Sequence, residues 1–305
     1  MRNENARGAP GARGKLRPDY TAPNALPAIA EAMTTHGVAP AQGAGALTAD
    51  GRLHRYRVEG DKPGTANGWA VIHLDGIPAA AFGSWKAGVY ATWRARDPVT
   101  EAEREQARQQ MAEARMQRDA EQAERHRQAA EKARRLWAKA KPANPSHPYL
   151  ARKGVPPLNA RQLGDALVLP LYTIDGTLTS LQFIQGDGAK RLLSGGRKQG
   201  ACIPVAGTAD TAPRLLIAEG WATAASVHTL EPDALVLAAV DAANLAAVAM
   251  AARSRWPGLP IVICADADPV GEKAARAAAR AVGGTVAMPP AGDFNDAANA
   301  ARGQA

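Results

Sequence analysis

The sequence predicts an α/β protein whose C-terminal part is a parallel sheet flanked by helices. Two short apolar runs, residues 215–218 and 261–265, each lead directly into carboxylates. Such uninterrupted runs are typical of strands that are buried on both faces of a parallel sheet. A third run, residues 235–240, lies between them, and a helical pattern follows each of the three. Right-handed βαβ connections would place these strands side by side in one compact sheet.

Length and composition limit the class of protein. With 305 residues, the chain is long enough for two domains. Its formal net charge of +8 favours a polyanionic partner. The cysteines, Cys202 and Cys264, form no C-x-x-C pair, so we expect neither a disulfide framework nor a zinc site. No signal peptide is evident, and the longest apolar stretch, residues 234–252, is interrupted by Asp241 and Asn244. We therefore expect a soluble, cytoplasmic protein without a membrane partner.

The N-terminal part is predicted to hold a basic arm and a small α+β domain. Residues 1–24 are rich in Arg, Gly and Pro and predict a disordered arm that either contacts nucleic acid or only aids solubility. A helix over 25–37 and turn-separated strands over 52–96 give a domain that spans 25–98. Its aromatic residues are interleaved with cations, so they either form the domain core or stack on the bases of a single strand. These aromatics are Tyr56, Trp69, Phe82, Trp85, Tyr90 and Trp93.

A long charged helix is predicted to fill the linker of residues 99–141. Thr100 and Glu103 have the spacing of a capping box, and the helical composition continues to about Lys139. The segment lacks an apolar heptad seam, which argues against a coiled coil. Its many oppositely charged pairs at helical spacing predict a solvated, semi-rigid spacer. Pro142 and Pro145 then end the helix.

Residues 142–210 are predicted to form a basic, β-rich subdomain. Strands over 166–171 and 178–184 flank a tight hairpin turn. The loop 190–200 then carries four cations around a glycine pair: Lys190, Arg191, Arg197 and Lys198. Such a loop could hold phosphates through its backbone N–H groups and side chains, although an ordinary solvated loop would look similar.

Three carboxylates follow the predicted strands of the C-terminal domain, residues 211–305. Glu219 follows the first strand, and Asp266 and Asp268 follow the third. In open α/β sheets ligands bind at the carboxyl ends of the strands, and residues two apart in an extended chain point to one side. Clustered carboxylates repel one another unless a cation neutralises them, and an oxygen-only site suits Mg²⁺ or Mn²⁺. We therefore predict a metal-dependent phosphoryl-transfer site. The alternative is a solvated loop or a helix N-cap.

Lys273 lies near the start of the helix that follows these aspartates. From there its side chain could reach a bound phosphate. An exposed helical lysine without a ligand would have the same sequence context.

These motifs resemble those of a known family. Residues 217–220 read Ile-Ala-Glu-Gly and residues 265–268 read Ala-Asp-Ala-Asp, which is similar to the Toprim domain of bacterial-type primases, topoisomerases and some nucleases. The segment 168–184, followed by Lys190 and Arg191, resembles the basic subdomain that precedes Toprim in primases. Residues 292–296 resemble the terminal motif of those primases. Residues 82–85 and 147–154 are similar to primases of phages and conjugative plasmids.

The resemblance implies a role for each matching residue. Glu219 would be a metal ligand or would accept the proton of the attacking hydroxyl, and Asp266 and Asp268 would hold the metal that carries the incoming nucleotide. Asp293 stands where primases have a further acidic residue. Asn295 replaces a second aspartate, so a second metal is expected only if Asp296 substitutes for it. The cations of the loop 190–200 would neutralise template or nucleotide phosphates. The zinc ribbon of typical bacterial primases has no counterpart in this sequence.

The function expected from this resemblance is that of a DNA primase. It would synthesise short RNA primers on single-stranded DNA from ribonucleoside triphosphates by metal-dependent nucleotidyl transfer, in plasmid or phage replication or in conjugation. A separate replicative helicase is the candidate further partner. Two alternatives stay open. One is a Toprim nuclease that hydrolyses phosphodiesters with the same carboxylates, and the other is a non-catalytic nucleic-acid-binding accessory of a helicase.

Overall fold

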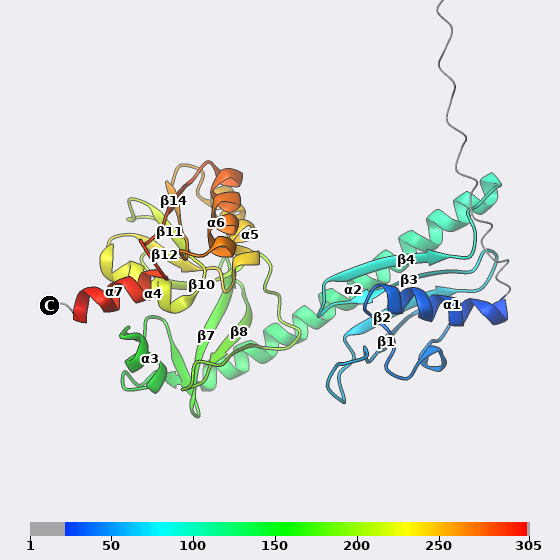
Figure 1. Ribbon diagram of the computed structural model, residues 1–305, viewed down its shortest axis with the longest axis horizontal. Helices are drawn as coiled ribbons and strands as arrows, with labels where there is room; N and C mark the ends of the chain where they lie inside the picture. Colours follow the sequence, from blue (N-terminus) through cyan, green and yellow to red (C-terminus); the bar gives the residue numbers. More distant parts are fainter. Residues whose placement is uncertain (1–21, 304–305) are drawn as a thin grey trace, which may run out of the picture. The chain divides into compact units, whose positions relative to one another are not determined.

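The computed structural model describes residues 22–303, which divide into two compact units (Figure 1). The boundary falls between Gln122 and Ala123, inside the helix α2 (Glu101–Lys139). Most of the predicted basic arm, residues 1–21, lies outside the described residues. Its last three residues do not belong to an arm, because the helix α1 (Ala22–Thr35) begins there. The five-segment division of the chain stays a prediction.

The first unit is a four-stranded antiparallel sheet between two helices (Figure 1). The sheet has the strand order β1-β2-β3-β4. The strands are β1 (Leu53–Tyr56), β2 (Gly68–His73), β3 (Ala79–Ser84) and β4 (Val89–Arg94), and a 3-10 turn, η1 (Ala44–Ala46), precedes them. On one face, Ile72 and Phe82 pack with Ile29 and Met33 of α1. On the other face, Trp69 packs in a cluster that includes Ala114 of α2.

This packing answers the question left open about the aromatic residues. Tyr56, Trp69 and Phe82 are all buried, so they form the core of the first unit. Tyr90 differs from them, because 46% of it is exposed. Its ring stacks on Trp69 at 5.9 Å, and the guanidinium of Arg118 lies 5.0 Å from the Tyr90 ring centroid. The Tyr90 ring is thus already in contact with other side chains of the first unit.

Helix α2 begins with the predicted capping box. The hydroxyl of Thr100 accepts a hydrogen bond from the Glu103 N–H at 3.2 Å, and the Glu103 carboxylate accepts one from the Thr100 N–H at 3.1 Å. Most residues of α2 are exposed or partly exposed, as in a solvated helix, but some of its alanines are buried: Ala114 in the first unit, and Ala129 and Ala133 in the second. Alanine is too small to produce an apolar heptad signal, yet it allows close approach of the helix to a sheet.

The second unit contains a ten-stranded mixed sheet. Its main order is β14-β13-β11-β12-β10-β7-β6-β5, with β8 paired to β7 and β9 paired to β8. The strands are β5 (Lys141–Pro142), β6 (Arg161–Leu163), β7 (Ala166–Thr173), β8 (Leu178–Ile184), β9 (Lys190–Leu192), β10 (Ala201–Ala206), β11 (Leu215–Ala218), β12 (Leu235–Ala238), β13 (Ile261–Cys264) and β14 (Thr285–Ala287). The helices are α3 (Pro148–Lys153), α4 (Trp221–Leu230), η2 (Ala242–Asn244), α5 (Leu245–Arg255), α6 (Pro269–Val282) and α7 (Phe294–Gly303).

The predicted parallel sheet is confirmed for four strands, β14, β13, β11 and β12. It does not stand alone, because β10 pairs antiparallel with β12 and with β7. Helices α4 and α7 pack together against one face of the sheet, and α5 and α6 cover the other (Figure 1). The indole N–H of Trp221 donates to the Leu158 carbonyl at 3.1 Å and so ties α4 to the segment after α3. Among residues 22–303, no helix has the length and apolarity to cross a membrane.

Candidate active site

The carboxyl ends of three parallel strands meet at one edge of the sheet. Ala218, the last residue of β11, is in register with Ala238 of β12 on one side and Cys264 of β13 on the other. Glu219 follows Ala218 directly, and Asp266 follows Cys264 after one alanine. Glu219 is therefore level with Ala265, one residue before Asp266, and both acidic residues lie just beyond the carboxyl ends of their strands.

A backbone contact draws the C-terminal loop to this edge. The Ala267 N–H donates to the Gly292 carbonyl at 2.7 Å, in an isolated antiparallel bridge. Gly292 has a φ of 64°, a left-handed conformation that favours glycine. The next residue, Asp293, is thereby held next to the loop that carries Asp266 and Asp268.

Electrostatic interactions link the four predicted carboxylates. Burial raises the pKa of Asp266 to about 6, with further contributions from Glu219, Asp293 and Asp268. Burial also raises the pKa of Glu219, and Asp241 and Asp268 add to the effect. Repulsion among these groups favours the protonated forms. The positive charge of Lys190 opposes both shifts.

Asp268 is a helix N-cap as well as a member of this group. Its Oδ1 accepts hydrogen bonds from the N–H groups of Val270 and Gly271, both at 2.9 Å, at the start of α6. Gly271 is in close contact with both aspartates, since a Cβ atom there would lie 3.1 Å from Asp268 Oδ2 and 3.4 Å from Asp266 Cβ. Asp268 therefore caps helix α6 and also lies close to the other carboxylates.

The polar residues at the start of α7 have two different roles: some cap the helix, and one is packed in the core. Asp293 Oδ1 accepts from the Asp296 N–H at 2.8 Å, and Asp296 Oδ2 accepts from the Asp293 N–H at 3.4 Å, which is a reciprocal cap. Asn295 is fully buried and donates to the Lys153 carbonyl at 2.7 Å and to the Ser226 hydroxyl at 2.9 Å. Asp296 faces the cap and Asn295 faces the core, so neither is placed as a substitute second aspartate.

Of the predicted cations, Lys190 is the one that lies with the carboxylates. Desolvation and the nearby Lys153 lower its pKa, while Glu219, Asp293 and Asp266 raise it. The side chain is solvent-accessible, yet protein atoms crowd it enough to cause the desolvation. Lys153, at the end of α3, was not predicted from the sequence. No local pattern marks it, because it joins the site only through the tertiary fold.

Three of the other predicted cations point elsewhere, and the fourth, Lys198, pairs with an acidic residue next to the group. Arg191 follows Lys190 on β9 and points to the opposite face, where its guanidinium lies 5.1 Å from the Phe183 ring centroid. Arg197 lines a separate open hollow of about 580 Å³, together with Arg255 of α5. Lys273 lies on the exposed side of α6. Lys198 forms an ion pair with Asp241.

The residues at the strand ends carry the type of ligand atom that a divalent metal such as Mg²⁺ prefers. In the part of the chain that is described, no three His, Cys, Asp or Glu side chains converge as a ready-made metal site. However, Asp266 Oδ1 is buried without a hydrogen-bond partner, which is unfavourable for a carboxylate oxygen. Its acidic neighbours offer only oxygen, the donor that Mg²⁺ and Mn²⁺ prefer.

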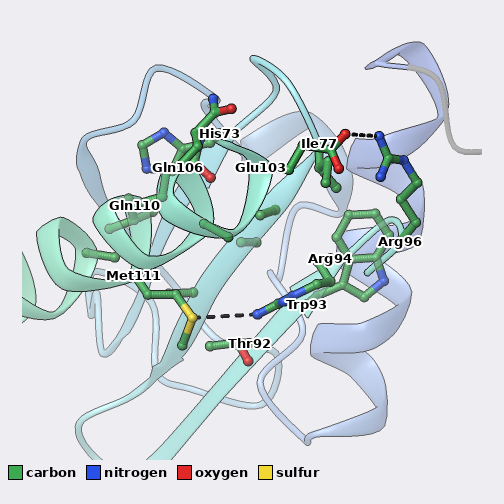
Figure 2. A pocket seen from close by; sticks show the side chains of 16 residues that line it. His73, Ile77, Thr92, Trp93, Arg94, Arg96, Glu103, Gln106, Gln110 and Met111 are labelled. Atoms are coloured by element: carbon green, nitrogen blue, oxygen red, sulfur yellow. Dashed lines mark hydrogen bonds and ion pairs between the residues drawn. The ribbon is translucent and has the colours of Figure 1, made fainter. Parts of the chain in front are cut away.

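The first unit contains a pocket of a different kind. Figure 2 shows that it lies between the sheet and α2, where Arg96 pairs with Glu103 at 2.6 Å. Alanines and Val71 line much of it, and its volume is about 40 Å³. Ligand pockets typically have volumes of about 300–1,000 Å³. This pocket is therefore too small for a nucleotide, and the strand ends of the second unit are the better candidate site.

Comparison with known proteins agrees with the fold and the strand-end motifs. Residues 214–304 match the family model of the Toprim domain. Two Escherichia coli proteins named DNA primase TraC are each 35% identical to the chain. One alignment covers 90% of this chain and 28% of the relative, and the other covers 86% and 19%. The chain thus spans a minor part of each relative, and the predicted resemblance to Toprim-type primases is confirmed.

A solved structure with a similar fold is the primase fragment of the bacteriophage T7 primase-helicase protein. It is 15% identical, with a TM-score of 0.42, and the match covers 54% of this chain and 77% of that one.

Proposed function

We propose that the chain is the catalytic part of a Toprim-type DNA primase, which makes short RNA primers on single-stranded DNA. The observation that carries the proposal is the grouping of Glu219, Asp266, Asp268 and Asp293 beside Lys190 at the strand ends. The sequence identity to proteins named DNA primase supports it. Phosphoryl transfer depends chiefly on positioning and on charge stabilisation, which is what clustered carboxylates and lysines can provide.

In this proposal Asp266 and Asp268 hold the divalent metal, with Asp293 as a further ligand. When bound, Mg²⁺ or Mn²⁺ neutralises negative charge on the phosphate that is being transferred. Asp268 can bind through Oδ2, because its Oδ1 is occupied by the N-cap hydrogen bonds. Glu219 either joins these ligands or accepts the proton of the attacking hydroxyl. Its raised pKa favours proton acceptance.

The cations have separate parts in the proposal. Lys190 and Lys153 lie beside the carboxylates and would neutralise the phosphates of the incoming ribonucleoside triphosphate. Arg191, Arg197 and Lys273 lie farther round the surface and would contact the backbone of the DNA template, where each charge adds a salt-dependent contribution to binding. Lys198 would contact the phosphates of the nucleotide.

The partners are single-stranded DNA and ribonucleoside triphosphates. By analogy with the named relatives, we place the activity in replication or conjugation of a plasmid or phage, in the cytoplasm, with a separate replicative helicase as a candidate partner.

The test is a priming assay on circular single-stranded DNA with labelled ribonucleotides and Mg²⁺ or Mn²⁺. Wild type is expected to give short labelled products that vanish in Asp266→Ala/Asp268→Ala. A matched control is Asp210→Ala/Asp233→Ala, which removes two exposed aspartates of the same unit and should prime normally.

Two other outcomes would replace the proposal. Degradation of the DNA without added nucleotide, lost in the same double variant, would assign a nuclease. Binding of single-stranded DNA without either reaction, unchanged by the double variant, would assign a non-catalytic accessory protein.

A further inference from the structure

Asp241 lies next to the candidate active site. It follows β12, whose last residue is in register with the end of β11. Its side chain makes no capping hydrogen bond to η2. The negative charge of Asp241 lies close enough to Glu219 to raise the pKa of that carboxyl. Asp241 is therefore a direct neighbour of Glu219.

An unusual backbone conformation turns the chain at this point. Val240 has a φ of 79°. A β-branched residue rarely adopts this left-handed region, because it strains the backbone. After this turn, Asp241 meets the loop 194–200.

Asp241 meets Lys198 of that loop. The Lys198 ammonium lies 2.5 Å from Asp241 Oδ2, and the two side chains are 35% and 41% exposed. Asp241 Oδ1 is buried without a hydrogen-bond partner. An ammonium has three N–H donors, so a contact to one carboxylate oxygen leaves others available to a ligand.

The backbone of this loop is anchored independently of Asp241. Asn244 is buried, and its Nδ2 donates to the carbonyls of Lys198, Ala201 and Ala239 at 3.2, 2.9 and 2.8 Å. Its Oδ1 accepts from the Gly200 N–H at 2.9 Å. Since Asn244 already fixes the loop to the end of β12, the contribution left to Asp241 is the position of the Lys198 side chain.

We propose that Asp241 is a positioning residue, which holds the Lys198 ammonium at the end of β12 so that it meets the phosphates of the incoming nucleotide. This inference rests on the proposed function of the site. A lysine side chain is a flexible four-carbon stem with a point charge at its end. Without Asp241, Lys198 would spread over many rotamers, and fewer of them would reach the nucleotide.

The experiment compares Lys198→Ala, Asp241→Asn and the double variant in the full chain. Asp241→Asn keeps the shape of the side chain and removes its charge. We expect each single variant to raise KM for the ribonucleoside triphosphate about fivefold with little change in kcat, as for a partly exposed charge pair. The double variant should be no worse than Lys198→Ala, because Asp241 acts through Lys198. Asp241→Glu should restore part of the loss.

Two further measurements separate this role from others. Titration with Mn²⁺ alone should give the same affinity for wild type and Asp241→Asn; weaker binding in the variant would make Asp241 a metal ligand and overturn the proposal. Additive losses, about 25-fold in the double variant, would also overturn it, because the two residues would then act independently.

Chemical acylation of Lys198, followed by mass spectrometry, tests the pair without any primase activity. The reaction should be faster in Asp241→Asn than in wild type, and equal rates would refute the pairing. If wild type binds no triphosphate and primes no DNA, the proposed function fails, and the acylation rates still report on the pair. If wild type primes and the variants match it, the positioning role alone fails.

Discussion

The protonation of Asp266 links the candidate site to the stability of the second unit. Its pKa in the folded protein is about 6. An aspartate in an unfolded chain titrates near 3.9, so between about pH 4 and pH 6 the folded state binds more protons than the unfolded state. The free energy of unfolding therefore decreases as pH rises through this window. Above it, the metal-free protein carries the full repulsion among its carboxylates.

This repulsion predicts that Asp266→Asn stabilises the metal-free protein. At pH 7 we expect a melting temperature higher by on the order of 2 °C, because one negative charge leaves the cluster. The gain should shrink at pH 5, where wild-type Asp266 is largely protonated. Melting curves with and without Mn²⁺ check both points: Mn²⁺ should stabilise wild type and not the variant. An Asp266→Asn protein that melts lower than wild type at pH 7 would contradict the prediction, and Asp210→Asn is the control.

The fully buried Asn295 predicts that a second aspartate cannot be restored by a single substitution. In Asn295→Asp a carboxylate would face the Lys153 carbonyl, which now receives a hydrogen bond from the amide. We expect a loss of about 3 kcal/mol in the free energy of unfolding, from an unpaired buried charge. Urea denaturation measures it. Asn299→Asp is the control, since its contact to the same carbonyl is longer, 3.4 Å. A stable Asn295→Asp with tighter Mn²⁺ binding would refute this view.

At the scale of elements, helix α6 depends on Asp268, which is both its N-cap and a proposed metal ligand. Asp268→Ala removes the N-cap of α6, and we expect it to lower the free energy of unfolding by about 1 kcal/mol. Asp268→Asn should keep that stability, because asparagine caps as well as aspartate. Both variants should lose priming. Comparing urea denaturation and priming for the pair separates the two roles. Priming by Asp268→Asn at the wild-type rate would exclude Asp268 as a metal ligand.

The elements that the sequence predicted well are those with a strong local signal. The runs at β11 and β13 are buried on both faces, so every residue is apolar and the strand is evident. The capping box at Thr100 is likewise local. By contrast, β10 was not predicted, since its pairing with both β12 and β7 depends on strands distant in sequence. The buried face of α2 was missed because alanine carries little hydrophobic signal.

The candidate site was predictable in part for the same reason. Glu219, Asp266 and Asp268 each follow a recognisable strand, so sheet geometry alone brings them together. The sequence could not show which of Lys190 and Arg191 points toward the carboxylates, because the face of β9 that each occupies depends on the register of β9 with β8. Lys153 reaches the site through tertiary contacts that no sequence spacing reveals.

At the scale of the whole molecule, the two units have separate hydrophobic cores. We therefore predict two calorimetric transitions, of which Mn²⁺ shifts only the one that belongs to the second unit. Ala114→Glu places a charge in the buried contact between α2 and the first sheet, and should lower the other transition by roughly 10 °C. Ala112→Glu, on the exposed side of α2, is the control and should change neither. A single transition that responds to both metal and Ala114→Glu would contradict this independence.

The pairing of β8 with β9 has a consequence for how this protein can evolve. Ile184 pairs with Lys190 and Phe183 with Arg191, so the two cations are sorted to opposite faces by their position along β9. Inserting or deleting one residue in the turn between the strands would exchange them, because side chains alternate with a period of two. Viable length changes in this turn should therefore come in even steps, or be accompanied by a bulge that restores the parity. Homologues with odd differences in turn length should carry their active-site lysine one position away.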